Sequence, residues 1–400
     1  MPDQALSGIK VLDVSHHVAG PYCTKLMADM GAHVIKVERP DAGDPARRKG
    51  PFPHDNPNQD ASGLFCYLNN NKQSITLNLK TGTGVKIFQE LVKKADILVE
   101  NFHPRVMPKL GLSYDSLKII NPGLVMTSIS NFGQSGPYRD FKATDIVLQA
   151  LGGWLWARGE PGREPVRAAG GLDVSGFIGG VYAATGTMTA YSFKIQTGLG
   201  QHVDISLMEA ASSMLTHHWA QRMFPKNPPV PPTRFAFIPG AEQCKDGYIG
   251  INTLTGMQWV SICGMMGMED WGDNPNYKIT SARVQRRQEI YDRIHPWLME
   301  HGKEEIFAEG QAWRVPVAPV YSNQDILNSP QHQAREYIVE VEHPVLGRVA
   351  QPGAVTKMTE TPWQIRSPAP LLGEHNEKVY GELCGYNRGE LVKLKEAGVI

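Results

Sequence analysis

One aspartate stands out among the residues that could do chemistry. Asp173 lies in the stretch AAGGLDVSGFIGGVYAATG at 168–186, among glycines and alanines. A short polar residue before an apolar run often caps a helix, so Asp173 could accept a hydrogen bond from the first turn of one. The alternative is a carboxylate kept accessible by small neighbours, because a carboxylate with a pKa near ~3.9 is ionised at pH 7 and can act as a nucleophile. The stretch alone leaves both interpretations open.

Histidine and cysteine give no comparable pattern. The pairs His16-His17 and His217-His218 are adjacent, and neighbouring side chains point apart in both helices and strands, so neither pair indicates a metal site. The five cysteines are odd in number and contain no CxxC pair, which argues against a disulfide framework and against zinc. We therefore expect no metal, and a reducing, cytoplasmic environment.

The first half of the chain reads as alternating strands and helices. IKVLDVS at 9–15 predicts a strand, the turn HHVAGPYCT leads into a helix at KLMADMG, and HVIKVERP at 33–40 predicts a second strand. The same analysis predicts strands at SITLNLK, DILVENF and GLVMTSISNFG, and an amphipathic helix at VKIFQELVKKA. This order indicates a mostly parallel sheet, and ligands of such sheets bind at the carboxyl ends of the strands.

Charged residues follow several of these predicted strands. Glu38 ends the second one, but the first turn lacks the GxGxxG of dinucleotide-binding folds, which makes a nicotinamide-dependent dehydrogenase a poor fit. Arg39 is a bidentate donor suited to phosphate, and Lys80, Arg105 and Lys109 also lie at or beyond strand ends. These cations are either solvated surface charges or part of a polyphosphate site.

Length and charge limit the remaining classes. At 400 residues, two domains are expected, and 40 Lys plus Arg against 40 Asp plus Glu leaves no net charge to hold nucleic acid or an anionic membrane. No run of ~18 apolar residues indicates a membrane span. The proline-rich stretch 224–240 predicts a linker. CKDGYIGINTLT predicts a hairpin or strand pair, and REYIVEVEHPVLGRVAQPG predicts a hairpin or meander.

Several stretches, in one order along the chain, resemble the class III CoA-transferases. They are LSGIKVLDVSHHVAGPYCTKLMADMGAHVIKVERPDAGD, NNNKQSITLNLKT, ADILVENFHP, SISNFGQSGPY, AGGLDVSGFIGGVYAATG, TGLGQHVDISLMEA and APLLGEH. This family includes formyl-CoA:oxalate and carnitine CoA-transferases and also the α-methylacyl-CoA racemases. The resemblance implies a cytoplasmic enzyme that moves CoA from an acyl-CoA to a carboxylic acid, with CoA as co-substrate and with neither a metal nor a redox cofactor.

The resemblance also implies roles for residues and domains. Asp173 would be the nucleophile, forming an aspartyl anhydride and then an aspartyl-CoA thioester. A Rossmann-like large domain at 1–205, a linker at 206–225, a smaller α+β domain at 226–328 and a C-terminal segment at 329–400 completing the large domain are expected, in an interlocked homodimer. The expected contacts with CoA are His17, Val18, Ala19, Arg39, Leu77, Lys80, Asn101, Phe102, Lys109 and Lys142.

Some residues depart from the family pattern. Val18 replaces a glutamine of the oxalate enzyme, which disfavours oxalate as the acceptor, and a glycine-rich lid loop keeps only Gly240 and Gly247. In racemases a histidine stands at the position of Thr144, and threonine cannot exchange a proton near neutral pH, so a racemase is the less favoured alternative. A CoA-binding subunit without catalysis is a third alternative. Three further residues could line an acyl pocket or belong to the core: Trp154, Trp156 and Met208.

Overall fold

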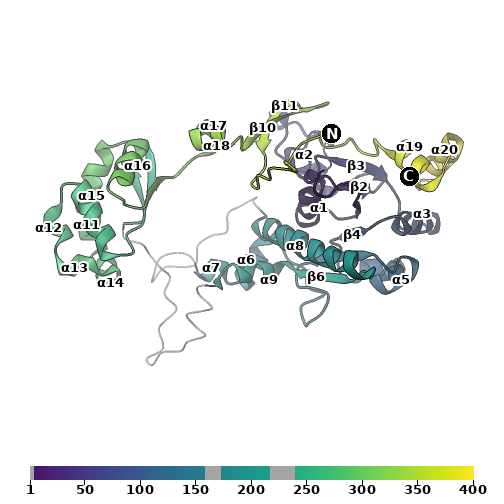
Figure 1. Cartoon of the computed structure of the whole chain (residues 1–400), viewed down its shortest axis with the longest axis horizontal. Helices are drawn as coiled ribbons and strands as arrows, with labels where there is room; N and C mark the ends of the chain where they lie inside the picture. Colours follow the sequence, from purple (N-terminus) through teal and green to yellow (C-terminus); the bar gives the residue numbers. More distant parts are fainter. Residues whose placement is uncertain (1–3, 158–172, 217–238) are drawn as a thin grey trace. The chain divides into compact units, whose positions relative to one another are not determined.

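The computed structural model describes residues 4–157, 173–216 and 239–400, which fall into two compact units (Figure 1). The first unit takes its described residues from Met1–Trp154, Arg167–Phe224 and Glu336–Ile400, and the second takes them from Leu155–Val166 and Pro225–Arg335. Residues 168–172 of the Asp173 stretch and most of the predicted linker, 224–238, lie outside the described residues. The exact domain boundaries expected from the sequence stay a prediction.

A six-stranded parallel sheet forms the centre of the first unit, in the order β3-β2-β1-β4-β5-β6. The predicted mixed α/β fold with a mostly parallel sheet is confirmed. The sequence pattern does not predict the last strand, β6, because this strand is only five residues long and has just two apolar side chains, Val203 and Ile205. The strands are β1 (Lys10–Asp13), β2 (His33–Glu38), β3 (Lys72–Thr76), β4 (Ile97–Glu100), β5 (Val125–Ser130) and β6 (His202–Ser206).

Helices cover both faces of this sheet because its strands are apolar on both sides. Val11 packs with α1 (Ala19–Asp29) and α8 (Val174–Thr197) on one face, and Leu12 packs with α3 (Gly82–Lys93) on the other. The predicted first helix begins at Ala19 rather than at Lys25, since a proline at position 21 is tolerated in a first turn. The other helical segments of this unit are η1 (Pro45–Arg48), η2 (Pro53–Asp55), α2 (Gly63–Leu68), α4 (Val106–Lys109), α5 (Tyr114–Ile120), α6 (Asp145–Leu151) and α9 (Leu207–Ser213).

Small residues in α8 bring it close to α1. A Cβ atom on Gly180 would lie 2.8 Å from the carbonyl oxygen of Ala19, so only glycine fits this contact. Part of the small-residue run after Asp173 therefore serves helix packing.

The C-terminal segment packs against the edge strand β3. The backbone N–H of His375 donates to the oxygen of Ser74 at 2.9 Å, and the Tyr380 hydroxyl donates to the oxygen of Thr76 at 2.7 Å. Antiparallel pairing of β10 (Ile338–His343) with β11 (Gly347–Pro352) confirms the predicted hairpin. Three helical segments follow it: α19 (Asn376–Val379), η3 (Tyr380–Cys384) and α20 (Arg388–Glu396).

The second unit has its own core around Trp259. Its three-stranded antiparallel sheet has the order β7-β8-β9, and the β7–β8 pair confirms the other predicted hairpin. No helix within the described residues is long and apolar enough to span a membrane. The elements are β7 (Ala241–Cys244), β8 (Gly247–Ile251), β9 (Val317–Pro319), α11 (Gly256–Met265), α12 (Glu269–Gly272), α13 (Pro275–Lys278), α14 (Thr280–Gln285), α15 (Arg287–Glu300), α16 (Lys303–Ala312), α17 (Asn323–Asn328) and α18 (Pro330–Ala334), and α7 (Trp154–Ala157) lies where the two units divide.

Candidate active site

Asp173 is the N-cap residue of α8. Its backbone is left-handed, with φ 33° and ψ 52°, and its Oδ1 accepts the N–H of Gly176 at 3.2 Å. A Cβ atom on Gly176 would lie 2.6 Å from that oxygen, so the glycine is required by the position of the carboxylate. The cap interpretation is thus correct as structure, and a cap can still carry chemistry because the carboxyl group is only partly buried.

A second carboxylate lies at the same helix end. Asp145, the first residue of α6, accepts the N–H of Val174 at 3.3 Å and that of Ser175 at 2.9 Å. A helix N-terminus stabilises negative charge through its free N–H groups and its dipole. Three successive amides of α8 are therefore bound by two aspartates.

The surroundings of Asp173 act on its pKa in both directions. Burial and the neighbouring charge of Asp145 raise the pKa of Asp173, while the Gly176 N–H, Lys49 and His17 lower it. The balance lies above the ordinary value. The carboxyl group is thus less acidic than a solvated aspartate.

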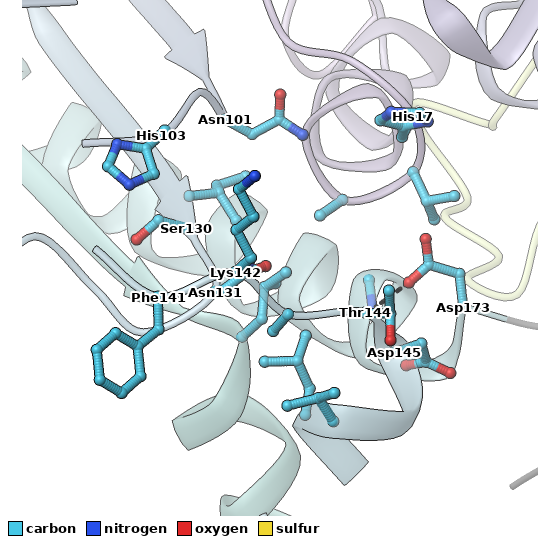
Figure 2. Close-up of a pocket in the computed structure, with 18 of the residues that line it drawn as sticks. His17, Asn101, His103, Ser130, Asn131, Phe141, Lys142, Thr144, Asp145 and Asp173 are labelled. Atoms are coloured by element: carbon cyan, nitrogen blue, oxygen red, sulfur yellow. Dashed lines mark hydrogen bonds between the residues drawn. The ribbon is translucent and has the colours of Figure 1, made fainter. Parts of the chain in front are cut away.

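Asp173 and Asp145 face a cavity of about 1010 Å³ at the carboxyl ends of the strands. Figure 2 shows both carboxylates together with Thr144, and His17, Asn101 and His103 on other parts of the cavity wall. Seven of the residues predicted for the site line this one cavity: His17, Val18, Ala19, Asn101, Phe102, Lys142 and Asp173. The described residues do not include a group of three or more His, Cys, Asp or Glu placed to hold a metal ion.

Four other predicted CoA contacts do not line the cavity. Arg39 and Lys80 are exposed after β2 and β3, Leu77 is buried directly after β3, and Lys109 is exposed at the end of α4. Trp154 does not line the cavity either. Its indole N–H donates to the backbone oxygen of Ala211 at 2.6 Å.

Buried polar groups hold the first turn, which carries His17. The His17 N–H donates to Oδ1 of Asp44 at 3.0 Å, and Asp44 forms an ion pair with Lys36 at 2.9 Å. Asn101 accepts the His16 N–H and donates to the His16 oxygen, both at 2.7 Å. These contacts give His17 its left-handed φ of 62° and its place in the cavity wall.

A family comparison decides what kind of site this is. Residues 6–376 match the model of CoA-transferase family III. The chain belongs to that family. The predicted resemblance is therefore confirmed, and the protein is a family III CoA-transferase with CoA as its co-substrate.

Relatives of the transferase match along nearly their whole length. It is 32% identical over 389 residues to a succinate–glutarate CoA-transferase of Agrobacterium fabrum, covering 94% of this chain and 95% of that protein. It is 31% identical over 423 residues to a formyl-CoA:oxalate CoA-transferase of Afipia carboxidovorans, covering 99% and 98%. The crystal structure of a CAIB/BAIF family protein from Brucella suis superposes with a TM-score of 0.82 at 28% identity, covering 95% of this chain and all of that one.

Among the cavity residues that sequence reasoning did not identify, Asp145 and Lys49 matter most to the transferase's site. Asp145 stands directly after Thr144 and is the first residue of α6, and an acidic residue at the start of a helix is the signal that the sequence offers for it. Lys49 lines the cavity from the end of η1. In the sequence it is the third cation in a row, after Arg47 and Arg48, and nothing in the sequence distinguishes it from these two.

Proposed function

We propose that this transferase moves CoA from an acyl-CoA to a carboxylic acid through covalent intermediates on Asp173. The observation that supports this most is the exposure of one carboxylate oxygen. Among the described residues, Oδ1 of Asp173 has a hydrogen bond from Gly176 whereas Oδ2 has none, and Asp173 lines the cavity. A partly desolvated carboxylate with a free oxygen is a competent nucleophile toward a thioester.

The reaction divides into four balanced substitutions. The carboxylate of Asp173 attacks the thioester carbonyl, the C–S bond breaks, and a mixed anhydride and the CoA thiolate result. The thiolate then attacks the Asp173 carbonyl and releases the donor acid as its carboxylate, leaving an aspartyl-CoA thioester. The acceptor carboxylate attacks that thioester to give a second anhydride and the thiolate, which finally attacks the acceptor's carbonyl and regenerates the Asp173 carboxylate.

Asp145 keeps the helix end in place during these steps. Asp173 loses its negative charge whenever it is acylated, and its hydrogen bond from Gly176 then weakens. Asp145 still accepts the N–H groups of Val174 and Ser175, so two of the three capped amides stay bound. The reacting carbonyl is thus held on a fixed element.

CoA would extend from Asp173 to the cations beyond the strand ends. His17, Asn101 and Lys142 lie in the cavity wall, and Arg39, Lys80 and Lys109 lie outside it, as a long polyphosphate ligand requires. The relatives are named for oxalate, succinate, glutarate and D-citramalate, which supports carboxylic acids as substrates.

We also propose the homodimer that the family resemblance implies. Apolar side chains of α8 that no described element covers support it, because exposed apolar groups on a helix favour association. The most exposed are Val181, Tyr182, Phe193 and Ile195.

Replacement of Asp173 tests the mechanism. Wild-type protein incubated with an accepted acyl-CoA should gain the mass of CoA on the peptide containing Asp173, or form a hydroxamate there with hydroxylamine. Asp173→Asn should abolish the adduct and lower transfer by several orders of magnitude. Its stability should stay within about 0.5 kcal/mol of wild type, because asparagine caps helices nearly as well and tolerates a left-handed backbone. Retained transfer in Asp173→Asn would reduce this residue to a helix cap.

A further inference from the structure

Arg47, Arg48 and Lys49 are three successive cations with different surroundings, and of the three only Lys49 lines the cavity. Arg47 is buried and donates two hydrogen bonds of 2.8 Å to Glu38. Arg48 is exposed and donates to the backbone oxygen of Ala42. Lys49 lines the cavity, and no described carboxylate forms an ion pair with its ammonium group. Its charge is therefore available to a ligand.

The position of Lys49 in the wall is set by buried neighbours. The Ser62 hydroxyl donates to the backbone oxygen of Lys49, and Asp44 accepts the N–H of Ala46 at 2.8 Å at the start of the same helical turn. Asp44 also accepts the N–H of His17. One buried carboxylate thus fixes the backbone of both cavity segments that face Asp173.

Lys49 is the lasting positive charge of this pair. Burial and the Lys49 charge lower the pKa of His17, so its imidazole is neutral at pH 7.5. The cavity that Asp173 lines therefore offers an acyl chain a cation at Lys49 and a neutral ring at His17.

We propose that Lys49 binds the free carboxylate of a dicarboxylic substrate, so that the enzyme selects dicarboxylic over monocarboxylic acids of equal length. This inference rests on the proposed transfer through Asp173. One carboxylate of such a substrate becomes the anhydride and the thioester carbon, whereas the other keeps its charge throughout. A charge-assisted hydrogen bond from Lys49 to that second carboxylate is present in every step, so it raises kcat/KM for a dicarboxylic acceptor tenfold or more.

Paired acceptors test the proposal on the full-length enzyme. Glutarate and pentanoate differ only in a terminal carboxylate against a methyl group, and kcat/KM for the acceptor reports reaction with the enzyme-bound CoA thioester alone. Wild-type enzyme should prefer glutarate at least tenfold. Lys49→Met should bring the ratio close to one by slowing glutarate, and Lys49→Arg should retain the preference. Arg48→Met removes the adjacent exposed cation and should leave the ratio unchanged.

The outcomes separate this proposal from the proposed function. An unchanged ratio in Lys49→Met, or an equal loss for both acceptors, would overturn the role of Lys49. So would a matching loss of affinity for free CoA, because Lys49 would then bind the CoA phosphates. A wild-type enzyme that shows the Asp173 adduct but no preference for glutarate also overturns it. A preference for glutarate that Lys49→Met removes, in an enzyme that forms no adduct, would instead overturn the mechanism at Asp173 and leave Lys49 as the selecting residue.

Discussion

Asp145 accepts the backbone N–H groups of the two residues that follow Asp173, so that two aspartates share the N-terminus of α8. Figure 2 shows the two carboxylates next to each other in the cavity wall. The free amides and the dipole of the helix attract both charges. The charges also repel each other, and after burial Asp145 is the largest cause that raises the pKa of Asp173.

Neutralising Asp145 should make Asp173 more acidic. Asp145→Asn keeps one side-chain oxygen, which can still accept the Ser175 N–H, and removes the repulsion, so the pKa of Asp173 falls. Because the ionised carboxylate is the proposed nucleophile, the acid limb of the pH profile of kcat/KM should move to lower pH. An acid limb that stays in place or moves upward would contradict this electrostatic coupling. Asp145→Ala also loses the hydrogen bonds and should cost about 1 to 2 kcal/mol in urea denaturation.

Removing Asp44 should destabilise the large unit. Burial alone would raise the pKa of Asp44, but Lys36 at 2.9 Å and the N–H groups of Ala46 and His17 hold it below its usual value. Its stabilising effect is therefore complete at neutral pH and is lost as the pH falls through that lowered pKa. Asp44→Ala leaves the buried Lys36 without this partner and should cost about 3 to 5 kcal/mol at pH 7.

The matched control for Asp44 is Asp41→Asn in the same turn, where the side chain is exposed. Urea denaturation of both variants measures the difference. Equal unfolding free energies for the two variants would show that the pair of Asp44 with Lys36 contributes nothing net.

Glu100 should give the protein a stability that depends on pH. Burial raises the pKa of Glu100 from 4.5 to about 7, although Ser128 and the Phe102 N–H partly oppose this by hydrogen bonding. The folded state thus favours the protonated acid, so this contribution is complete below pH 4.5 and is lost as the pH rises through about 7. Glu100→Gln stays neutral and should be more stable than wild type at pH 8, by an amount on the order of 3 kcal/mol, with little gain at pH 4.5.

Urea denaturation at several pH values between 4.5 and 8 follows the Glu100 effect. Glu90→Gln serves as the control, since Glu90 is exposed on α3 and pairs with Lys93 at the surface. A constant difference between Glu100→Gln and wild type over this range would mean that Glu100 titrates normally in the folded protein.

Local pattern was enough to predict most of the central sheet. Strands β1 to β5 are short apolar runs that end in polar residues, and α3 repeats its apolar side chains at helical spacing, so each element was recognisable by itself. Strand β6 is not predicted because this edge strand is only five residues long and has just two apolar side chains, Val203 and Ile205, which pack on one face. The sequence predicts the start of α1 at Lys25, six residues after its start in the structure at Ala19, because a glycine and a proline in the first turn are typical of a loop.

The sequence by itself determined the family, the parallel sheet and Asp173 as the residue of interest, because these depend on local composition and on motifs in a recognisable order. Only the tertiary structure decided which residues meet that carboxylate. Asp145 and Lys49 are 28 and 124 residues away along the chain, and both reach the cavity through the packing of elements that no local pattern relates. Hydrogen bonds, burial and charge between such segments exist only once the chain is folded, so the raised pKa of Asp173 and the presence of Lys49 in the same cavity could not be predicted from the residues in order.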